Sequence, residues 1–473
     1  MEKDYKQFEK NIEEAVAKFK ALNKKERIRV ISHLDADGIC ACAILLKALN
    51  NDNRNYSISI VQQLNEQVLK NISKEDYKNY FFTDLGAGQL DLINKHLKGK
   101  NVFVLDHHTP NEAELDDNIV HVNPHLHGID GGTEISGSGV TFLFTNKLNN
   151  KKDMAYVAVI GAIGDIQEDK GFQKLNNDIL QMAIDEGHIT VKKGLRVFGM
   201  QTKPLHKTLE YCSDPFIPGV SGSESGAIQF LQQIGINPKD KKGWKKMIHL
   251  NDEEIKKLIG AVIMRRVDED NPEDVIGNIY VLNNEKEESS LRDAKEFATL
   301  LNSCGRLNKA SIGIGVCLND KTAKKKALAN AENYKREIVK GMRWYNDNRE
   351  SKDIITENGF IIINAKENIL VSMAGTVASI LSKSNELKKG TFIMSLARNI
   401  VEDTSKVSLR IAGNNNNVNL KEVIETITKN IENAESGGHA AAAGAIIPTS
   451  KERDVIEEAK RVLKLNSIEE KIE

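Results

Sequence analysis

Cysteines are few in this sequence, and their spacing forms no recognisable pattern. There are five among 473 residues, and no two of them form a C-x-x-C pair. An odd number of scattered cysteines argues against a disulfide framework and against a zinc knuckle, so we expect small buried side chains. The five are Cys40, Cys42, Cys212, Cys304 and Cys317.

Long apolar runs are absent as well. No stretch of about 18 apolar residues occurs, so the sequence predicts no membrane-spanning helix. The first 26 residues are charged throughout and lack the apolar core that a signal peptide requires. We therefore expect a cytoplasmic protein that does not associate with membranes.

Neither sign of charge is in excess. The 66 Lys and Arg residues oppose 67 Asp and Glu residues, which gives a formal net charge of -1. This balance excludes a uniformly basic surface, so any polyanion would have to be bound by a local patch. With 40% hydrophobic residues, a chain of this length can form two to four domains.

The pattern of apolar runs predicts an α/β fold in four parts. Residues 1–190 alternate strand-like runs with helix-period stretches, which is typical of an α/β domain with a largely parallel sheet. Residues 191–318 are rich in Lys, Gly and Pro loops and predict an inserted α/β module. Residues 319–350 predict a long linking helix, and residues 351–473 a second α/β domain.

Three potential metal ligands follow the first strand-like run. In "ISHLDADG", His33, Asp35 and Asp37 come directly after the apolar run "RIRVI". If this segment is extended, alternate residues share one face and these three side chains point together. The alternative is that "DADG" forms a solvated turn.

Three further apolar runs end in acidic residues. "YFFTDLG" places Asp84, "NVFVLDHH" places Asp106 before two histidines, and "VAVIGAIGD" places Asp165. Each has a structural alternative: Asp84 caps the next helix, Asp106 orients a neighbouring histidine, or Asp165 marks a helix terminus. Because chemistry collects at the carboxyl ends of parallel strands, we expect all of them at one edge of the sheet.

Such a cluster predicts bound cations. Five aspartates carry a formal charge of about -5, which two divalent ions would bring near -1. Carboxylates mixed with imidazoles suit Mn²⁺, our first choice, and also Mg²⁺ or Co²⁺, better than zinc. Two ions roughly 3.5–4 Å apart activate a water and hold a phosphate ester, which predicts hydrolytic phosphoryl transfer.

The motifs "SHLDADG", "FTDLG", "LDHH" and "GAIGD", in this order, resemble those of the DHH phosphoesterase superfamily. The resemblance implies that His33 and Asp35 bind one metal and that Asp84 bridges to a second one. It also implies that His108 faces the scissile phosphate, and we expect Asp106 to orient a neighbouring histidine. The full set of implied metal ligands is His33, Asp35, Asp37, Asp84, His107 and Asp165.

The segment "SGGHAAAAG" resembles the glycine-rich motif of the DHH-associated domain that accompanies most superfamily members. We expect the backbone N–H groups of Gly437 and Gly438 to approach an anion, with His439 beside them. In "VSLR", Ser408 and Arg410 share a strand face, and arginine suits bidentate phosphate contact. The alternative is that the glycines mark a tight helix start.

The middle of the chain indicates a branch of the superfamily. The stretch "AKEFATLLNSCGRLNKASIGIGVCLND" resembles archaeal RecJ-like proteins, including the GINS-associated nuclease. That branch is related to the catalytically inert activator of the eukaryotic replicative helicase, and its inserted domain is implicated in binding GINS. The stretch would also pack as an ordinary amphipathic helix.

Since every implied ligand is retained, the resemblance predicts an active enzyme. We expect a Mn²⁺-dependent exonuclease on single-stranded DNA or RNA, acting with GINS in archaeal DNA replication or repair. The basic stretches "KDKKGWKK" and "KTAKKK" would contact phosphates or simply lie in solvent. Two other functions stay open: a phosphodiesterase of short oligonucleotides or cyclic dinucleotides, and a replisome scaffold. Exonuclease polarity and DNA versus RNA preference do not follow from the sequence.

Overall fold

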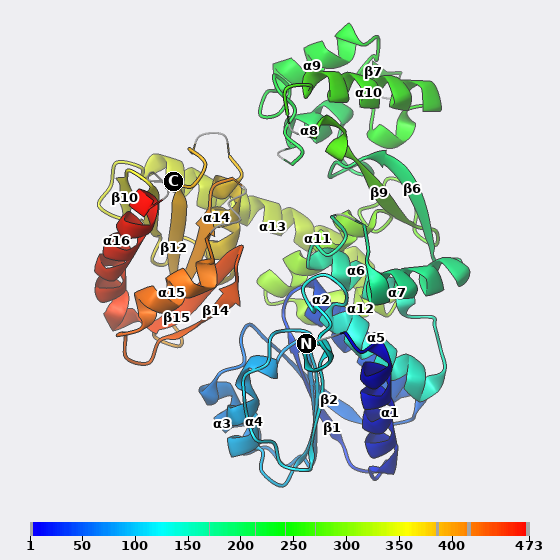
Figure 1. Ribbon diagram of the computed structural model, residues 1–473. Helices are drawn as coiled ribbons and strands as arrows, with labels where there is room; N and C mark the ends of the chain where they lie inside the picture. Colours follow the sequence, from blue (N-terminus) through cyan, green and yellow to red (C-terminus); the bar gives the residue numbers. More distant parts are fainter. Residues whose placement is uncertain are drawn as a thin grey trace. The chain divides into compact units, whose positions relative to one another are not determined.

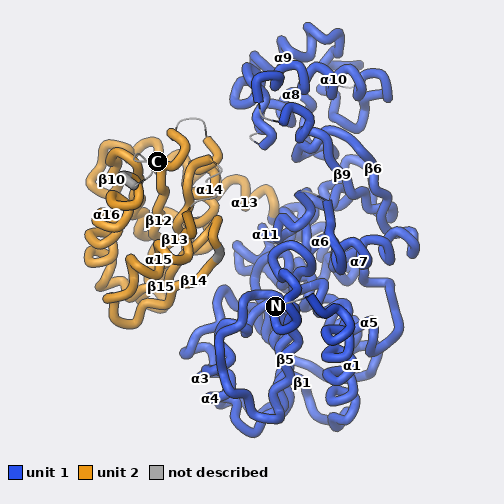
Figure 2. Tube along the Cα trace, in the orientation of Figure 1, with its two compact units in different colours: residues 1–330 blue, residues 331–473 orange. Residues whose placement is uncertain are grey.

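The protein folds into two compact units, residues 1–330 and 331–473 (Figure 2). The computed structural model describes residues 3–169, 171–212, 214–241, 243–269, 271–384, 387–413 and 418–469. Among these residues, no helix is both long and apolar enough to cross a membrane.

A five-stranded parallel sheet organises the first unit (Figure 1). Its strand order is β2-β1-β3-β4-β5, and every neighbouring pair is parallel, which confirms the predicted fold class. Strand β2 lies on one side of β1, and β3, β4 and β5 follow on the other side. The strand order therefore reverses beside β1, which is where α/β sheets place their ligand sites. The strands are β1 (Ile28–His33), β2 (Tyr56–Val61), β3 (Asn79–Thr83), β4 (Asn101–Leu105) and β5 (Ile119–Val122).

Helices cover both faces of this sheet. On one face, Phe19, Phe81, Phe103 and Phe144 form an aromatic cluster, with the Phe81 and Phe103 rings stacked 4.7 Å apart. The opposite face packs on apolar side chains of two short helices. Burial on both faces explains why the strands read as continuous apolar runs. The helices are α1 (Tyr5–Ala21) and α5 (Gly137–Asn149) on the aromatic face, and α3 (Glu66–Ser73) and α4 (Leu90–His96) on the other.

Two segments near the predicted site differ from expectation. The prediction that His33, Asp35 and Asp37 share an extended face is wrong, because β1 ends at His33 and helix α2 (Ala36–Asn51) begins at once. The Asp35 carboxylate caps this helix by accepting the Gly38 N–H at 3.0 Å, which favours the helical turn over an extended chain.

The apolar run before Asp165 is a helix. It forms α6 (Ala155–Gly164), which packs against α2, α5 and α7 (Lys174–Asp185). A continuous apolar run reads the same in a buried strand and in a buried helix, so periodicity alone does not separate them.

The inserted segment is a helical cluster carried on an antiparallel ribbon. Strands β6 (Ile189–Leu195) and β9 (Ile276–Leu282) form the ribbon. Between them, helices α8, α9 and α10 enclose a separate apolar core that includes Leu205, Leu231 and Leu258. The other elements of the segment are α8 (Leu205–Glu210), α9 (Glu224–Gln233), α10 (Asp252–Arg265), β7 (Lys239–Asp240) and β8 (Gly243–Trp244).

Helices α11 (Ala294–Arg306) and α12 (Ala310–Cys317) pack mainly outside the inserted segment, although the predicted module extends to residue 318. They pack on α2 and α6 of the sheet domain. The Asn302 side chain, from α11, accepts the Ala36 N–H at the start of α2 at 2.9 Å. The apolar face of α11 is thus buried against the domain that bears the aspartates. The four-part division by residue number stays a prediction.

The second unit is built on a six-stranded mixed sheet, joined to the first unit by the helix α13 (Lys321–Asp347). The strand order is β10-β11-β12-β13-β15-β14. The alternative that the glycines of "SGGH" mark a helix start is wrong, because this segment is strand β14, antiparallel to β15. The elements are β10 (Ile354–Glu357), β11 (Phe360–Asn364), α14 (Ala374–Ser382), β12 (Phe392–Asn399), β13 (Thr404–Ile411), α15 (Leu420–Thr428), β14 (Glu435–His439), β15 (Ala442–Pro448) and α16 (Glu452–Glu469).

Candidate metal centre

The carboxyl ends of β1, β3 and β4 bring the predicted aspartates and histidines together, joined by residues from α2 and from the end of α6. Asp37, Asp84, Asp106 and His107 are buried and form the floor of the site. The side chains of the remaining four are 22–35% exposed and form its rim. The rim residues are His33, Asp35, His108 and Asp165.

Asp84 lies at the centre of the site, directly after β3. Its backbone has a left-handed φ of 58°, which aspartate tolerates better than most residues, and its N–H bonds to the Leu105 carbonyl at 2.9 Å. Its side chain caps no helix: the short helix that follows has Gly86 at its N-cap and no side-chain cap bond. The capping alternative for Asp84 is therefore wrong.

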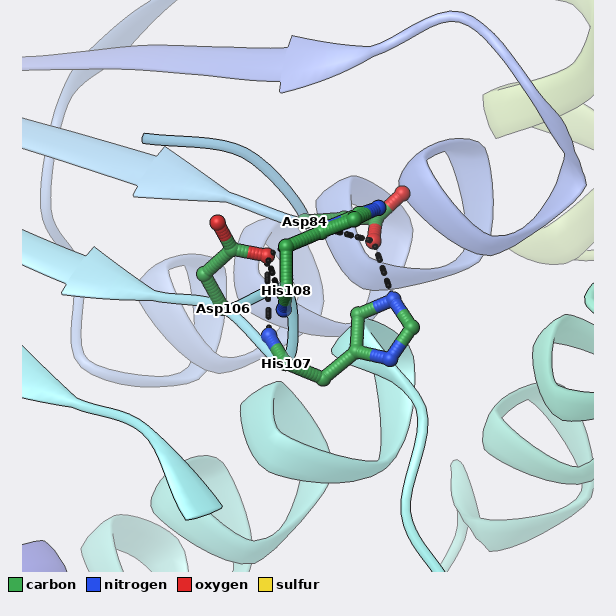
Figure 3. A group of neighbouring side chains, drawn as sticks. All are labelled: Asp84, Asp106, His107 and His108. Carbon is green, nitrogen blue, oxygen red and sulfur yellow. Dashed lines mark hydrogen bonds and ion pairs between the residues drawn. The ribbon is translucent and has the colours of Figure 1, made fainter. Parts of the chain in front are cut away.

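The two oxygens of Asp84 face different groups of ligands. Oδ2 lies 3.5 Å from His33 Nδ1, which is itself 2.9 Å from Asp35 Oδ2. Oδ1 lies 3.3 Å from His107 Nε2 (Figure 3). His107 Nε2 is also 3.3 Å from Asp165 Oδ2. The geometry thus forms two adjacent ligand sets that share one carboxylate.

The buried polar atoms at this centre fit two cations. Both Asp84 oxygens, His33 Nδ1 and His107 Nε2 are buried, and none of them makes a hydrogen bond within the described part of the chain. Leaving four such atoms unsatisfied is costly unless a ligand binds them. Three groups have ligand atoms within 4.8 Å of one another: His33–Asp35–Asp84 and Asp37–His107–Asp165 correspond to the two sets, and Asp84–Asp106–His107–His108 overlaps both. Their assignment as metal ligands stays a prediction that these donor atoms support.

Neighbouring backbone groups fix the orientation of the ligands. His107 Nδ1 lies 2.7 Å from the Gly131 carbonyl, so the ring donates there and turns Nε2 toward the carboxylates. Asp37 accepts the N–H groups of Gly137 at 2.6 Å and Ser138 at 3.1 Å, at the start of α5. A Cβ atom at Gly137 would overlap the Asp84 side chain. Only the small-residue run "SGSG" hinted at these contacts in the sequence.

Asp106 holds His108, as expected of an orienting carboxylate. Its Oδ1 lies 2.8 Å from His108 Nδ1 and accepts the His107 N–H at 2.8 Å, while Oδ2 accepts the Ala87 N–H (Figure 3). The His108 side chain lies at the rim of the site and is 35% exposed. Asp165 caps the C-terminus of α6, where a carboxylate is electrostatically unfavourable, so a helix-end role alone does not account for it.

Crowding of the carboxylates shifts their protonation. Burial and the nearby Asp84 raise the pKa of Asp37 to about 7, and burial together with Asp37 raises the pKa of Asp165 well above its usual value. Burial alone would lower the pKa of His107, but the surrounding aspartates raise it well above normal. Without cations the centre therefore retains protons that cations would displace.

Metal binding is expected to release protons. Near pH 6.5 the metal-free centre holds protons on groups with raised pKa, and a cation must displace them, so apparent affinity should rise with pH. Titrating Mn²⁺ into the metal-free protein by calorimetry, in buffers of different ionisation enthalpy, should show release of about one proton or more. Binding heats identical in all buffers would contradict this expectation.

The predicted substrate-binding residues lie together on the sheet of the second unit. Ser408 and Arg410 face α14, because a Cβ atom at Gly375 would lie 3.3 Å from Ser408 Oγ and 3.4 Å from an Arg410 nitrogen. Gly438 has a φ of 135° and pairs with Ala443, while Gly437 pairs with Gly444. The side chain of His439 lies outside the described residues. The substrate-binding role of this group stays a prediction.

Comparisons with known proteins agree with this fold. Three family profiles match: "DHH family, N-terminal domain" at residues 27–163, "DHH-CID domain" at 197–280 and "DHHA1 domain" at 358–465. The chain belongs to the DHH phosphoesterase superfamily, in its RecJ-like branch. The family assignment places it among hydrolases of phosphoester bonds, as the sequence predicts.

Two related sequences are similar to this chain, one over nearly its whole length and one over about a third of it. The chain is 30% identical over 455 residues to uncharacterized protein MJ0831 of Methanocaldococcus jannaschii, covering 94% of this chain and 95% of that protein. It is 27% identical over 175 residues to the single-stranded-DNA-specific exonuclease RecJ of Bacillus subtilis, covering 34% of this chain and 22% of that enzyme.

Two solved structures share the fold. Thermus thermophilus RecJ in complex with Mn²⁺ matches with a TM-score of 0.59 and 17% identity, over 96% of this chain. This chain spans 55% of that RecJ. Entamoeba histolytica Cdc45 matches with a TM-score of 0.64 and 15% identity, over 97% of this chain and 99% of that protein.

Proposed function

We propose that this protein is a two-metal exonuclease that hydrolyses phosphodiester bonds in single-stranded DNA or RNA. The observation that carries the proposal is Asp84, whose two buried oxygens accept no hydrogen bond from the described residues and face two separate ligand sets. Single-strand exonucleolysis is supported by the Bacillus subtilis relative, and Mn²⁺ by the Thermus RecJ complex.

The residues of this chain divide the chemistry among them. Two bound divalent cations, Mn²⁺ by preference, would activate the attacking water and stabilise charge on the phosphate. Asp37 is fixed by its contact to the start of α5, and Asp84 by its contact to the Leu105 backbone. These two contacts fix the positions of the two ligand sets relative to each other. His108, partly exposed at the rim and oriented by Asp106, donates a hydrogen bond to the phosphate or a proton to the leaving oxygen.

The cellular role belongs to the same proposal. The archaeal relative and the Cdc45-like fold support a place in archaeal DNA replication or repair, with GINS as the partner and the cytoplasm as the location. In the second unit, Ser408, Arg410 and the Gly437–Gly438 backbone would bind the strand, with His439 beside them.

Single-stranded DNA labelled at either end should be shortened progressively in Mn²⁺ and remain intact in EDTA. Products would be resolved on a sequencing gel, and the label released first as a mononucleotide would set the polarity. Intact long strands would overturn the proposal. Cleavage of dinucleotides by the same preparation would then support the short-substrate phosphodiesterase, and inertness toward both would leave the scaffold.

A further inference from the structure

A basic face lies on α13, within the second unit. Six side chains at helical spacing line a shallow hollow of about 300 Å³, and all six are exposed. Positions three and four apart on a helix lie on one side, so these residues form a single surface. We call this surface the α13 basic face; its residues are Glu332, Lys335, Arg336, Val339, Lys340 and Arg343.

This face carries four cations and one carboxylate, in a chain whose net charge is only -1. Glu332 pairs with Lys335 at 2.7 Å. Among the described residues, no ion pair involves Arg336, Lys340 or Arg343. These three side chains thus form an uncompensated positive patch of the kind that a polyanion would require.

Helix α16, in the same unit, shows how a solvated basic helix is arranged. Lys460 pairs with Glu457 at 2.8 Å, and Arg461 pairs with Glu458 three residues away. Pairs at this spacing neutralise surface charge within the helix itself. The α13 basic face lacks such partners for three of its four cations, so an ordinary solvated helix face does not account for it.

An apolar side chain lies among these cations. Val339 is 56% exposed between Arg336 and Arg343. These two arginines are seven residues apart, or about 10 Å along the helix, and Lys340 lies between them. A row of separated cations around an apolar contact suits an extended chain of phosphates and sugars better than one compact anion.

We propose that the α13 basic face binds backbone phosphates of a single-stranded nucleic acid, apart from the phosphate being cleaved. The proposal rests on the proposed function, because a strand is the polyanion that the enzyme would process. Arg336 and Arg343 contact phosphates through their guanidinium forks, Lys340 adds a point charge, and Val339 contacts a sugar or a base. Long strands therefore gain affinity here that dinucleotides do not.

The test compares two triple variants of the full chain, each losing two arginines and one lysine. R336Q/K340Q/R343Q removes the unpaired cations of the α13 basic face, and R453Q/K460Q/R461Q removes the same charge from α16. Binding of a fluorescent dT 20-mer is followed by anisotropy at several salt concentrations, with Ca²⁺ in place of Mn²⁺. Hydrolysis of a dinucleotide in Mn²⁺ is measured in parallel.

The α13 variant should bind the 20-mer about tenfold more weakly, and its log–log salt slope should fall by about 2, as for three lost phosphate contacts. The α16 variant should stay within about twofold of the wild type, and dinucleotide hydrolysis should be unchanged in both. R336K/R343K, which keeps the charge, should retain most of the affinity and shows that folding is intact.

Unchanged 20-mer affinity in the α13 variant, or an equal loss in the α16 variant, would overturn the proposal and leave an acidic protein as the partner to test. Absence of cleavage in the wild type would count against the proposed function only, because the binding comparison does not require turnover.

Discussion

Replacing Asp84 with alanine should remove both metals and lower kcat/KM for strand hydrolysis by about a thousandfold or more. Each Asp84 oxygen faces a different ligand set, at 3.5 Å from His33 Nδ1 and 3.3 Å from His107 Nε2. Losing this side chain takes one ligand from both sets at once. Metal content by mass spectrometry and kcat/KM on labelled strands would measure the two effects together.

The matched control is Asp76→Asn, which removes an exposed carboxylate of the same domain. It should leave metal content and activity unchanged. Because Asp84→Ala also removes a buried charge from a crowded cluster, the metal-free variant should be no less stable than the metal-free wild type. Added Mn²⁺ should then raise the thermal midpoint of the wild type only. A variant that keeps two metals and a tenth of the activity would contradict the bridging role.

Replacing Asp106 with asparagine should lower kcat about 10–100-fold while both metals stay bound. Asp106 contacts His108 Nδ1 and backbone N–H groups, which leaves it outside the two ligand sets, although its carboxylate lies within 4.8 Å of ligand atoms of Asp84, His107 and His108. Burial by itself lowers the pKa of His108, but the carboxylates of Asp106 and Asp84 together outweigh it, so the pKa is raised. Removing the negative charge should lower that pKa. If His108 acts as the protonated donor, the alkaline limb of the kcat profile should then move to lower pH.

His108→Ala provides the comparison for this prediction. It should lower kcat about 100-fold or more and abolish the shift of the alkaline limb. Adding Asp106→Asn to His108→Ala should cost little further, because both substitutions remove the same interaction. Loss of metal from Asp106→Asn, or an unshifted pH profile, would show that Asp106 acts through His107, whose N–H it also accepts.

The sequence was enough to predict that these aspartates and histidines lie close together, although the extended geometry expected for the first three of them was wrong. His33, Asp35 and Asp37 meet through a strand end, a helix N-cap and the first turn of that helix, instead of along one extended face. Asp165 arrives from the end of a helix, where a strand end was equally consistent with the sequence. For Asp84 and the run from Asp106 to His108, the position directly after an apolar strand was enough to place them at the carboxyl edge of the sheet.

The supporting contacts were not predictable from the sequence. The Gly131 carbonyl fixes His107, the Gly137 and Ser138 N–H groups hold Asp37, and Asn302 caps α2 from a distant helix. These are backbone and amide groups that every sequence contains in abundance. Apart from the small-residue run "SGSG" at the start of α5, nothing in their local pattern distinguishes the few that reach the centre from the rest.

By itself, the sequence determined the α/β class, the parallel sheet of the first domain and the identity of the clustered aspartates and histidines. Those features are local: alternation of apolar runs, and polar residues placed directly after them. Tertiary structure alone decided that α11 and α12 pack on the sheet domain and that "SGGH" is a strand. These outcomes depend on contacts between residues far apart in the chain, and the local sequence pattern does not show which distant residue each side chain or backbone group will contact.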